Sequence, residues 1–568
     1  MKNFLIVYEK QKYSIVEKSE NVLHLEKNNV ILLFLTTQST ENQKNNNLLD
    51  DYQRHGIDFI KDIKDSFSLF IYDKNIDKIF IAKDKVGIQP LYFSQYANTI
   101  IIGTSLKQFP KISTFNPILN NNSIAQYLQY GLILQPNTIF QNCHKVKSGS
   151  YVSFDLKTQK YISTSYWRLE DCYLEEKSTA SENEILHNSH NLLSESLEKN
   201  MQKYKIGFAL SGGYDSSALV AMAQASSEKK INTFSIGFKE QSINEAPHAK
   251  EISNYLGTNH TEHYFTAKDA VEIIPDIAKM YDEPFADHAV APTILISQLL
   301  KQDNITKLIA GDGGDEVFAT ADELKSFERF KQTPEALKKF IASSLKILPT
   351  PNKLKSKKNK LSQMLMAKNI ASIIKVRKSL FLEEELSLYI KNLKPKIYSS
   401  FDEINFPKNA ETVDQIIGTY FKTTMTDGEL VKSHTAVNHL NINLAVPFLD
   451  TKLIEYMATV PSSLKVKNGI KKYLLKEITY QYLPKKLIEK PKTGFDIPFS
   501  LWMKKELKDL VYLQINKKRL DEDNIFYTSS ILNIRDQFYA GDNTYKYKLW
   551  RIFIFQLWYH DLQQTIKG

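Results

Sequence analysis

Residues 206–217 read Ile-Gly-Phe-Ala-Leu-Ser-Gly-Gly-Tyr-Asp-Ser-Ser, which is an apolar run followed by a glycine pair and two serines. The residues after it, 216–225, have helical character. A glycine pair between a buried strand and a helix lets the backbone turn sharply and approach an anion closely. The start of the next helix presents free N–H groups and a positive dipole end to that anion. We therefore predict a phosphate-binding strand–loop–helix unit here.

The side chains of this loop suit a nucleotide's phosphates held with a metal ion. Ser211, Ser216 and Ser217 offer hydroxyl donors. Asp215 would repel phosphate unless a cation lies between them, so it indicates Mg²⁺. The pattern G-x-x-x-x-G-K-[ST] is absent, which excludes a Walker A loop. A glycine-rich turn with a serine cap and no ligand is the alternative.

A second apolar run, residues 307–310, leads into Gly-Asp-Gly-Gly-Asp-Glu at 311–316. Three glycines and three carboxylates in so short a segment are unusual for a solvated loop. Apolar runs alternate with helical stretches in this region, which predicts parallel strands in a doubly wound α/β sheet. Because such strand ends open on one crevice, Asp215 and Asp315 would be able to hold one Mg²⁺ on a nucleotide. A plain acidic turn is the alternative.

The first 170 or so residues are predicted to be rich in β-strand, and later parts mostly helical. The predicted strands are residues 30–35, 67–72, 78–82, 98–103, 151–156 and 161–167. A polar linker is predicted at 175–184. We interpret the Lys-rich stretch 351–360 as a solvated loop, and the aromatic-rich stretch 545–559 as a packed terminal helix.

Composition limits the class of protein. The chain has 568 residues, 42% hydrophobic and 24% charged, which is typical of a globular protein. The net charge of +10 permits an anionic partner without requiring one. The only cysteines, Cys143 and Cys172, exclude a disulfide scaffold and a cysteine-rich metal cluster. Apolar runs are too short for a bilayer and no signal peptide is evident, so we expect a cytoplasmic protein without membrane or nucleic-acid partners.

Several motifs together resemble the asparagine synthetase family, in its glutamine-hydrolysing form. Residues 211–216 match the S-G-G-x-D-S signature of the ATP-pyrophosphatase, or PP-loop, fold. The other matching segments, in the family's order, are Phe234-Ser-Ile-Gly-Phe238, Asp282-Glu-Pro-Phe-Ala-Asp287, Gly311-Asp-Gly-Gly-Asp-Glu316, Val446-Pro-Phe-Leu-Asp450 and Lys490-Pro-Lys-Thr-Gly-Phe495. The resemblance extends from about residue 185 to the C-terminus.

The resemblance implies a fold and a reaction. It implies an N-terminal-nucleophile-like αββα sandwich over residues 1–175. It implies a PP-loop synthetase domain, with a doubly wound parallel sheet and added helices, over 185–568. The implied enzyme is a ligase that uses ATP to convert a carboxylate into an acyl-adenylate and pyrophosphate, after which ammonia or an amine displaces AMP. The carboxylate would belong to a small molecule or a peptide, and a homodimer or a precursor-peptide partner stays open.

The resemblance also assigns roles to residues. Leu210, Ile236 and Gly311 would lie against the adenosine part of ATP. The residues implied to hold pyrophosphate and metal are Ser211, Gly213, Asp215 and Ser216, to which the loop argument above adds Gly212 and Ser217. Lys492 matches the family's lysine in a K-x-G-F segment, which steadies negative charge in both steps. Asp312 stands where the family has an acidic residue near the reacting centre, and it is a candidate to accept a proton from the amine.

The N-terminal region resembles the family's glutaminase domain without its nucleophile. Residues 84–92 resemble its R-D-x-x-G-x-x-P-L-Y segment. In the family a cysteine directly after the initiator Met attacks the glutamine amide. Here Lys2 stands at that position, and Cys143 and Cys172 lie far along the chain. The glutamine-binding N-G-E and R-G-P-D segments are not recognisable. We predict a glutaminase-shaped domain without glutaminase activity.

The missing nucleophile leaves the nitrogen source open between ammonia and an amine. β-Lactam synthetases and lasso-peptide cyclases have also lost this cysteine and close a ring with an internal amine. Where the family reads S-L-E-V-R-V, this chain has Asn443 and Ala445 in place of Glu and Arg. Because Arg holds a carboxylate with two hydrogen bonds, we expect weaker recognition of free aspartate and a larger or peptide-like substrate. Asparagine synthesis, ring closure and a non-catalytic scaffold are the alternatives.

Overall fold

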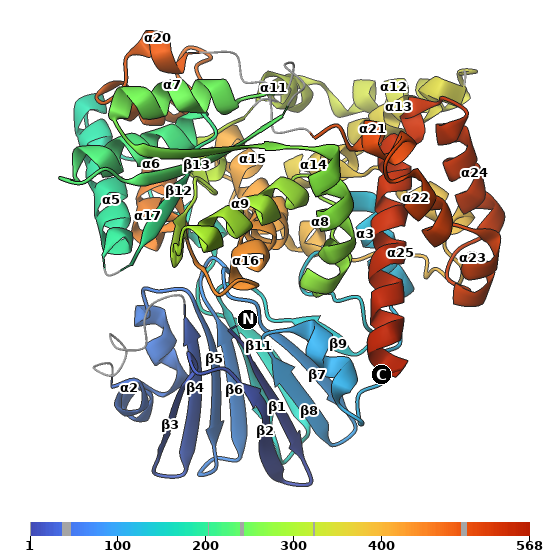
Figure 1. Cartoon of the computed structure of the whole chain (residues 1–568), viewed down its shortest axis with the longest axis horizontal. Coiled ribbons are helices and arrows are strands. Elements are labelled where there is room, and N and C mark those ends of the chain that lie inside the picture. The colour runs from blue at the N-terminus through green and yellow to red at the C-terminus, as the bar shows by residue number, and fades with distance from the viewer. Residues whose placement is uncertain are drawn as a thin grey trace.

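The computed structural model shows a β-sandwich below a larger α/β part (Figure 1). It describes residues 2–36, 47–202, 204–238, 244–321, 324–350, 352–489 and 497–567. Among these, no helix combines the length and the apolar character that crossing a bilayer requires.

The N-terminal sandwich consists of two antiparallel sheets. The first has the order β2-β1-β8-β7-β9 and comprises β1 (Phe4–Glu9), β2 (Lys12–Lys18), β7 (Tyr92–Tyr96), β8 (Thr99–Gly103) and β9 (Cys143–Lys145). The second has the order β11-β10-β6-β5-β4-β3 and comprises β3 (Leu23–Lys27), β4 (Val30–Thr36), β5 (Phe67–Asp73), β6 (Lys78–Lys83), β10 (Ser150–Asp155) and β11 (Lys160–Ser165).

Alternating side chains form the layers of this sandwich. In β1, Phe4 and Ile6 pack between the two sheets, whereas Leu5 and Val7 pack outward against the helical part. The outer face of the second sheet is covered by α2 (Leu48–His55) and η1 (Gly56–Asp62). The outer face of the first sheet shares a core with α3 (Asn121–Tyr130), α8 (Ala267–Met280) and the C-terminal helix.

The larger part contains the predicted doubly wound sheet. Its parallel strands have the order β14-β13-β12-β15-β16, with β12 (Ile206–Ala209), β13 (Asn232–Phe238), β14 (Asn259–Phe265), β15 (Lys307–Ile309) and β16 (Asn443–Ala445). The helices that pack against it include α6 (Tyr214–Ala225), α7 (Ala246–Leu256), α9 (Val290–Gln302) and α16 (Leu430–Asn438). From β12 the chain first forms β13 on one side of that strand, and later forms β15 on its other side. β12 and β15 therefore flank the switch point, where α/β sheets bind ligands.

Helices complete the fold. Those of the connections and of the second half are η2 (Leu106–Lys111), α4 (Leu169–Cys172), α5 (Glu182–Met201), α10 (Gly314–Phe318), α11 (Leu324–Gln332), α12 (Glu335–Ile347), α13 (Asn352–Leu365), α14 (Ile370–Lys378), η4 (Glu383–Leu388), η5 (Ser400–Glu403), α15 (Thr412–Tyr420), η6 (Phe421–Glu429), η7 (Pro447–Leu449), α17 (Thr451–Thr459), α18 (Ser462–Lys465), α19 (Tyr473–Tyr480), α20 (Lys485–Ile488), α21 (Phe499–Lys504), α22 (Lys508–Gln514), α23 (Lys517–Asp523), α24 (Thr528–Tyr539), η8 (Asn543–Tyr545) and α25 (Lys546–Lys567). α15, η6 and α16 follow one another directly, and η6 is a π-helix.

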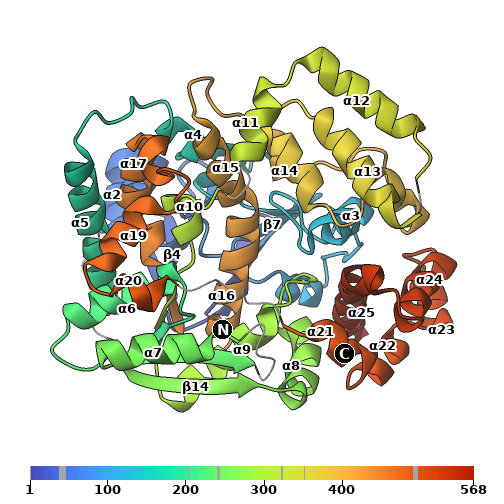
Figure 2. The same cartoon turned by 90° about the horizontal axis from the view of Figure 1, so that it is seen from above.

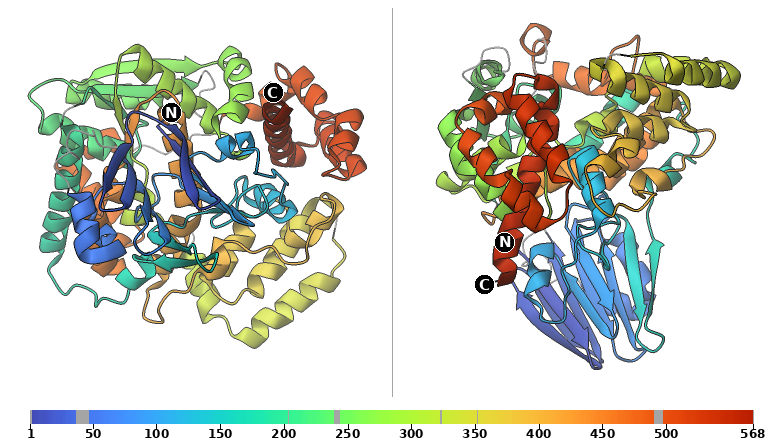
Figure 3. Two further views of the ribbon diagram at one scale, coloured as in Figure 1. Left: turned by 90° about the horizontal axis from the view of Figure 1, so that it is seen from below. Right: turned by 90° about the vertical axis from the view of Figure 1, so that its right-hand side faces the viewer.

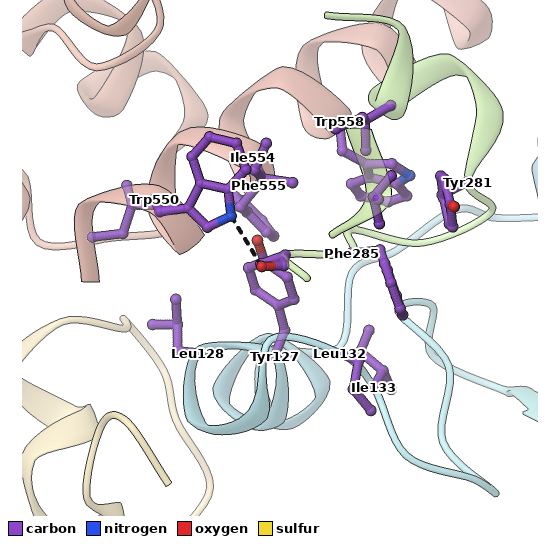
Figure 4. Close-up of a cluster of buried hydrophobic side chains, with 14 of the residues drawn as sticks. Tyr127, Leu128, Leu132, Ile133, Tyr281, Phe285, Trp550, Ile554, Phe555 and Trp558 are labelled. Carbon is purple, nitrogen blue, oxygen red and sulfur yellow. Dashed lines mark hydrogen bonds between the residues drawn. The ribbon is translucent and has the colours of Figure 1, made fainter. Parts of the chain in front are cut away.

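The C-terminal helix α25 is packed into the core, as predicted. Trp550 and Trp558 are buried, and the Trp550 indole Nε1 donates to the Ala286 carbonyl at 2.9 Å (Figure 4). Tyr127 of α3 donates its hydroxyl to the Arg551 carbonyl at 2.6 Å. α25 therefore joins the part that contains α3 to the part that contains α8, at the margin of the sandwich seen in Figure 3.

The structure corrects the sequence prediction in two respects. The Lys-rich stretch is not a loop, because α13 covers Asn352–Leu365. Lysine has a good helix propensity, and α13 gains stability by packing along α12. The prediction also missed strands. Polar and charged side chains weaken the apolar pattern of β2, β3 and β14 at the sheet edges, but β1 and β7, inside the first sheet, were missed as well.

Candidate active site

The loop between β12 and α6 is folded on itself by its serines. Ser216 Oγ accepts from the Ser211 amide at 3.1 Å and donates to the Gly213 carbonyl at 3.2 Å, while the Gly213 amide donates to Ser211 Oγ at 3.3 Å. Gly212 has a φ of 84°, the left-handed conformation that glycine adopts without strain. The sharp turn places Asp215 in the first turn of α6, at the mouth of the crevice.

Glycines of the second loop allow it to pack directly on Asp215. A Cβ atom on Gly314 would lie 2.3 Å from Asp215 Oδ1, and one on Gly311 would lie 3.1 Å from the Ser216 amide. Neither position has room for a side chain. The close approach brings Asp315, which follows these glycines, to the same point as Asp215.

One ammonium group joins these two carboxylates. Lys472 Nζ lies 2.6 Å from both carboxylate oxygens of Asp215 and 2.6 Å from Asp315 Oδ1. Burial by itself lowers the pKa of Lys472, but the two carboxylates raise it above its ordinary value, so the lysine is charged. Sequence analysis did not find Lys472, since no motif links a residue 257 positions away to Asp215.

The donor set at this point fits magnesium. Asp215 and Asp315 offer hard carboxylate oxygens within reach of one cation. Among the described residues, no group of three or more His, Cys, Asp or Glu side chains is placed to hold a metal by itself. Mg²⁺ commonly binds through one or two carboxylates and completes its shell with phosphate oxygens and water. The pair therefore suits a metal that arrives with a nucleotide.

The two loops border a cavity of about 650 Å³ at the switch point of the sheet. Its lining includes the predicted residues Leu210, Ser211, Asp215, Ser216, Ile236, Gly311, Asp312 and Asp315. Gly212, Gly213 and Ser217 do not line it. Ser217 is buried, and its hydroxyl has no hydrogen-bond partner among the described residues. Lys492 lies outside the described residues.

Acidic groups and one buried lysine form another part of the cavity lining. Burial raises the pKa of Asp312 to about 6, an effect that Lys432 partly offsets, and Asp312 Oδ2 has no hydrogen-bond partner among the described residues. Lys432 Nζ lies 3.4 Å from Asp287 Oδ2 and bonds the Glu429 carboxylate. Burial, then the charges of Asp315 and Glu429, raise the pKa of Glu316 to about 8. The cavity lining thus holds two carboxyl groups, those of Asp312 and Glu316, whose pKa values lie on either side of neutral pH.

The expectation drawn from Asn443 and Ala445 concerns residues outside the large cavity. Both lie on β16, and neither lines that cavity. Ala445 lines a separate hollow whose charged residues include Asp65 and Asp450 as well as Lys85 and Lys199. The weaker recognition of free aspartate that the missing arginine predicts stays a prediction.

The start of the chain packs between the sandwich and the α/β part. The Lys2 amide donates to Asn438 Oδ1 at 3.4 Å, and Lys2 Nζ bonds Asn443 Oδ1. Burial raises the pKa of the Cys143 thiol far above its ordinary range and that of Cys172 to about 12, so both thiols stay protonated. A reactive thiolate is therefore absent from both cysteines.

Comparison with known proteins gives two family matches. The model described as "Asparagine synthase" matches residues 189–560, and "Glutamine amidotransferase domain" matches residues 29–167. The chain is 24% identical to asparagine synthetase [glutamine-hydrolyzing] 1 of Bacillus subtilis over 523 residues, covering 90% of this chain and 80% of that one. It is 31% identical to putative asparagine synthetase [glutamine-hydrolyzing] 2 of Methanocaldococcus jannaschii over 275 residues, covering 48% and 52%. It is 22% identical to a putative asparagine synthetase [glutamine-hydrolyzing] of Mycobacterium bovis over 528 residues, covering 90% and 79%.

Replacing the bridging lysine tests this geometry. Lys472→Met should lower the free energy of unfolding by about 1–3 kcal/mol, because it removes the counter-charge of Asp215, which is partly buried, and of Asp315, whose side chain is 44% exposed. Mg²⁺ should restore part of that loss if it binds the pair. Urea denaturation with and without Mg²⁺ measures both effects. Lys467→Met is the control, since this lysine forms a more exposed pair with Glu182. Equal losses in the two variants would contradict the bridging role.

Proposed function

Because the chain belongs to the asparagine synthase family, we propose that it adenylates a carboxylate with ATP and passes the acyl group to ammonia or an amine. That it is an ATP-dependent ligase that forms C–N bonds follows from the family itself. The observation that carries the finer proposal is the convergence of Asp215 and Asp315 on one cation at the switch point.

In the first step, a carboxylate oxygen attacks the α-phosphorus of ATP. The bond between the α-phosphorus and the bridging oxygen breaks, and pyrophosphate leaves. The Ser211 hydroxyl and the Ser216 amide, at the start of α6, supply donors to the departing phosphates. Asp215 and Asp315 would hold Mg²⁺, which would supply positive charge there. Lys472, which contacts both carboxylates, would add a further positive charge beside the phosphates. Leu210 and Ile236 are the apolar groups for the adenosine part.

In the second step, the amine nitrogen attacks the acyl carbon and the C–O bond to AMP breaks. The attacking nitrogen must lose a proton. Asp312 suits this transfer, since its buried Oδ2 faces no partner among the described residues and its pKa of about 6 leaves it ionised at neutral pH. Lys492, predicted from the sequence, would steady the negative charge in both steps.

The nitrogen comes from outside the N-terminal part. Lys2 replaces the nucleophile, and its side chain is bonded to Asn443 and so held between the two parts. The sandwich has a structural role in this proposal. Lys145 pairs with Glu283 at 2.7 Å, and the backbone N–H of Gln135 donates to Asp427 at 2.9 Å. Through the second contact the N-terminal part supports η6, the helix that borders the cavity.

Replacing Asp215 tests the nucleotide site. Asp215→Asn should slow ATP–pyrophosphate exchange about 100-fold or more, because it removes a charge that the metal and the phosphates need. Asp303→Asn, at the exposed end of α9, is the control and should leave the exchange unchanged. Normal exchange in Asp215→Asn would remove the basis for this site. No exchange in the wild-type protein with any carboxylate would favour a non-catalytic scaffold.

The proton acceptor gives a pH dependence with a definite sign. Since Asp312 must be ionised to accept a proton, aminolysis should be slow below its pKa and rise as the pH passes about 6. Asp312→Asn should lose this rise. Single-turnover reaction of the acyl-adenylate with hydroxylamine measures the step, provided that the rate at each pH is divided by the concentration of unprotonated hydroxylamine, and ATP–pyrophosphate exchange serves as the reference. An identical rise in Asp312→Asn would assign the proton transfer to another group.

The nitrogen source can be tested with the same protein. AMP formation should increase with ammonium or hydroxylamine and not with glutamine, and no glutamate should appear, because the nucleophile for glutamine is missing. Cys143→Ala and Cys172→Ala should each leave the ammonium-dependent rate unchanged. Glutamate release at a rate matched to AMP formation would contradict the proposal. A substrate with its own amine that forms a cyclic amide would identify ring closure.

A further inference from the structure

Helix α12 exposes a stripe of large apolar side chains. The exposed fractions are 46% for Leu337, 70% for Phe340, 37% for Ile341, 84% for Ile347 and 55% for Leu348. Their spacing of three, four and seven residues places them on one face of the helix. Contiguous apolar surface of this kind marks a site of interaction, whereas single exposed side chains do not.

This stripe is not the face with which α12 holds the fold. Ala342 and Lys338 are buried on another face, and Lys338 Nζ lies 3.8 Å from the centre of the Phe330 ring. The Ser362 hydroxyl of α13 donates to the Ala342 carbonyl at 3.1 Å. α12 is therefore held in the fold through its contacts with α13, and its apolar stripe faces solvent.

The same segment carries an extreme charge. Residues 336–382 contain eleven lysines and one arginine and no aspartate or glutamate. Since the whole chain has a net charge of +10, the rest of it sums to −2. Lys339 and Lys346 are exposed on α12, on the side away from the stripe, and Lys357 and Lys368 are exposed further along. The segment that carries the exposed apolar stripe is thus strongly basic, although Lys338 and Lys375 pair with Glu335 and Asp402.

The hairpin of α12 and α13 stands at the edge of the molecule. Figure 2 shows α12 on the outside, with α13 between it and the remaining helices, and Figure 3 shows the pair projecting from the body. An apolar helix face that projects from the molecule can insert into a lipid surface without a clash of the remaining protein with that surface.

We propose that α12 and α13 dock this protein on the surface of an anionic lipid bilayer. Phe340 and Ile347 enter the region below the headgroups, and Lys339 and Lys346 lie among lipid phosphates, the arrangement by which an amphipathic helix lies in a membrane interface. Nucleic acid would satisfy the lysines and leave the apolar stripe in water. The proposal is independent of the reaction and replaces our expectation that membranes play no part.

Sedimentation with vesicles tests the proposal on the full chain. Wild-type protein should sediment with vesicles of phosphatidylcholine and phosphatidylglycerol, less so at higher salt, and not with phosphatidylcholine alone. Phe340→Ser with Ile347→Ser should weaken this partition about tenfold or more, as should Lys339→Gln with Lys346→Gln. Ile162→Ser is the matched control, because Ile162 is 69% exposed on β11, far from the hairpin.

The variants must keep their fold for the comparison to count. All four changed positions on α12 are exposed, so ATP–pyrophosphate exchange should remain at the wild-type rate. Loss of vesicle binding in both double variants, with full exchange, supports the proposal. Absence of wild-type binding to anionic vesicles overturns it. The proposal is also overturned if the wild-type protein is a dimer that the serine variants convert to a monomer. It is overturned as well if the protein binds duplex nucleic acid as strongly as vesicles and the serine variants do not weaken that binding.

Discussion

The reversal of strand order between β12 and β15 forces two acidic loops into one crevice, and the remaining site depends on balancing that charge. Each loop follows directly from its strand, so neither can move away without disturbing the sheet. Asp215 and Asp315 meet there, and Lys472 offsets one of their two negative charges. In the proposed function a metal ion with its phosphates would take over that role, so substrate binding would be an exchange of counter-ions.

One continuous helical segment, α15–η6–α16, ties this site to the sandwich. On one side Met425, Glu429 and Lys432 line the large cavity. On another, Asp427 and His434 border the small hollow at the start of the chain. Burial lowers the pKa of His434 to about 4, so this histidine is neutral at physiological pH. The π-helical turn in η6 widens the helix where it serves both spaces, and such turns often occur at functional positions. The helical segment thus links the sandwich to the site, which is the structural task that the proposed function gives to the sandwich.

Local patterns predicted the doubly wound sheet and its two loops, because glycines after apolar runs mark strand ends that approach a ligand or another loop. The sandwich was predicted from the family resemblance. Lys472 could not be predicted, since its pairing with Asp215 arises from the tertiary fold. The role given to Ala445 stays a prediction, because sequence does not show which hollow a side chain on a short strand enters. Partial exposure hides the apolar pattern of an edge strand such as β14, whereas β1 was missed although it is buried. The motif around Lys492 remains a prediction, as it lies outside the described residues.

The glycines of the second loop also bear on how such a protein can diversify. A Cβ atom on Gly313 would lie 2.3 Å from Leu449 Cδ2, and one on Gly314 equally close to Asp215 Oδ1. Neither glycine can therefore be replaced without displacing a neighbouring side chain. The opposite, helical wall of the cavity, from Ile417 to Lys432, carries side chains of many kinds. A change in the molecules that the cavity accepts would be easier to make on that wall.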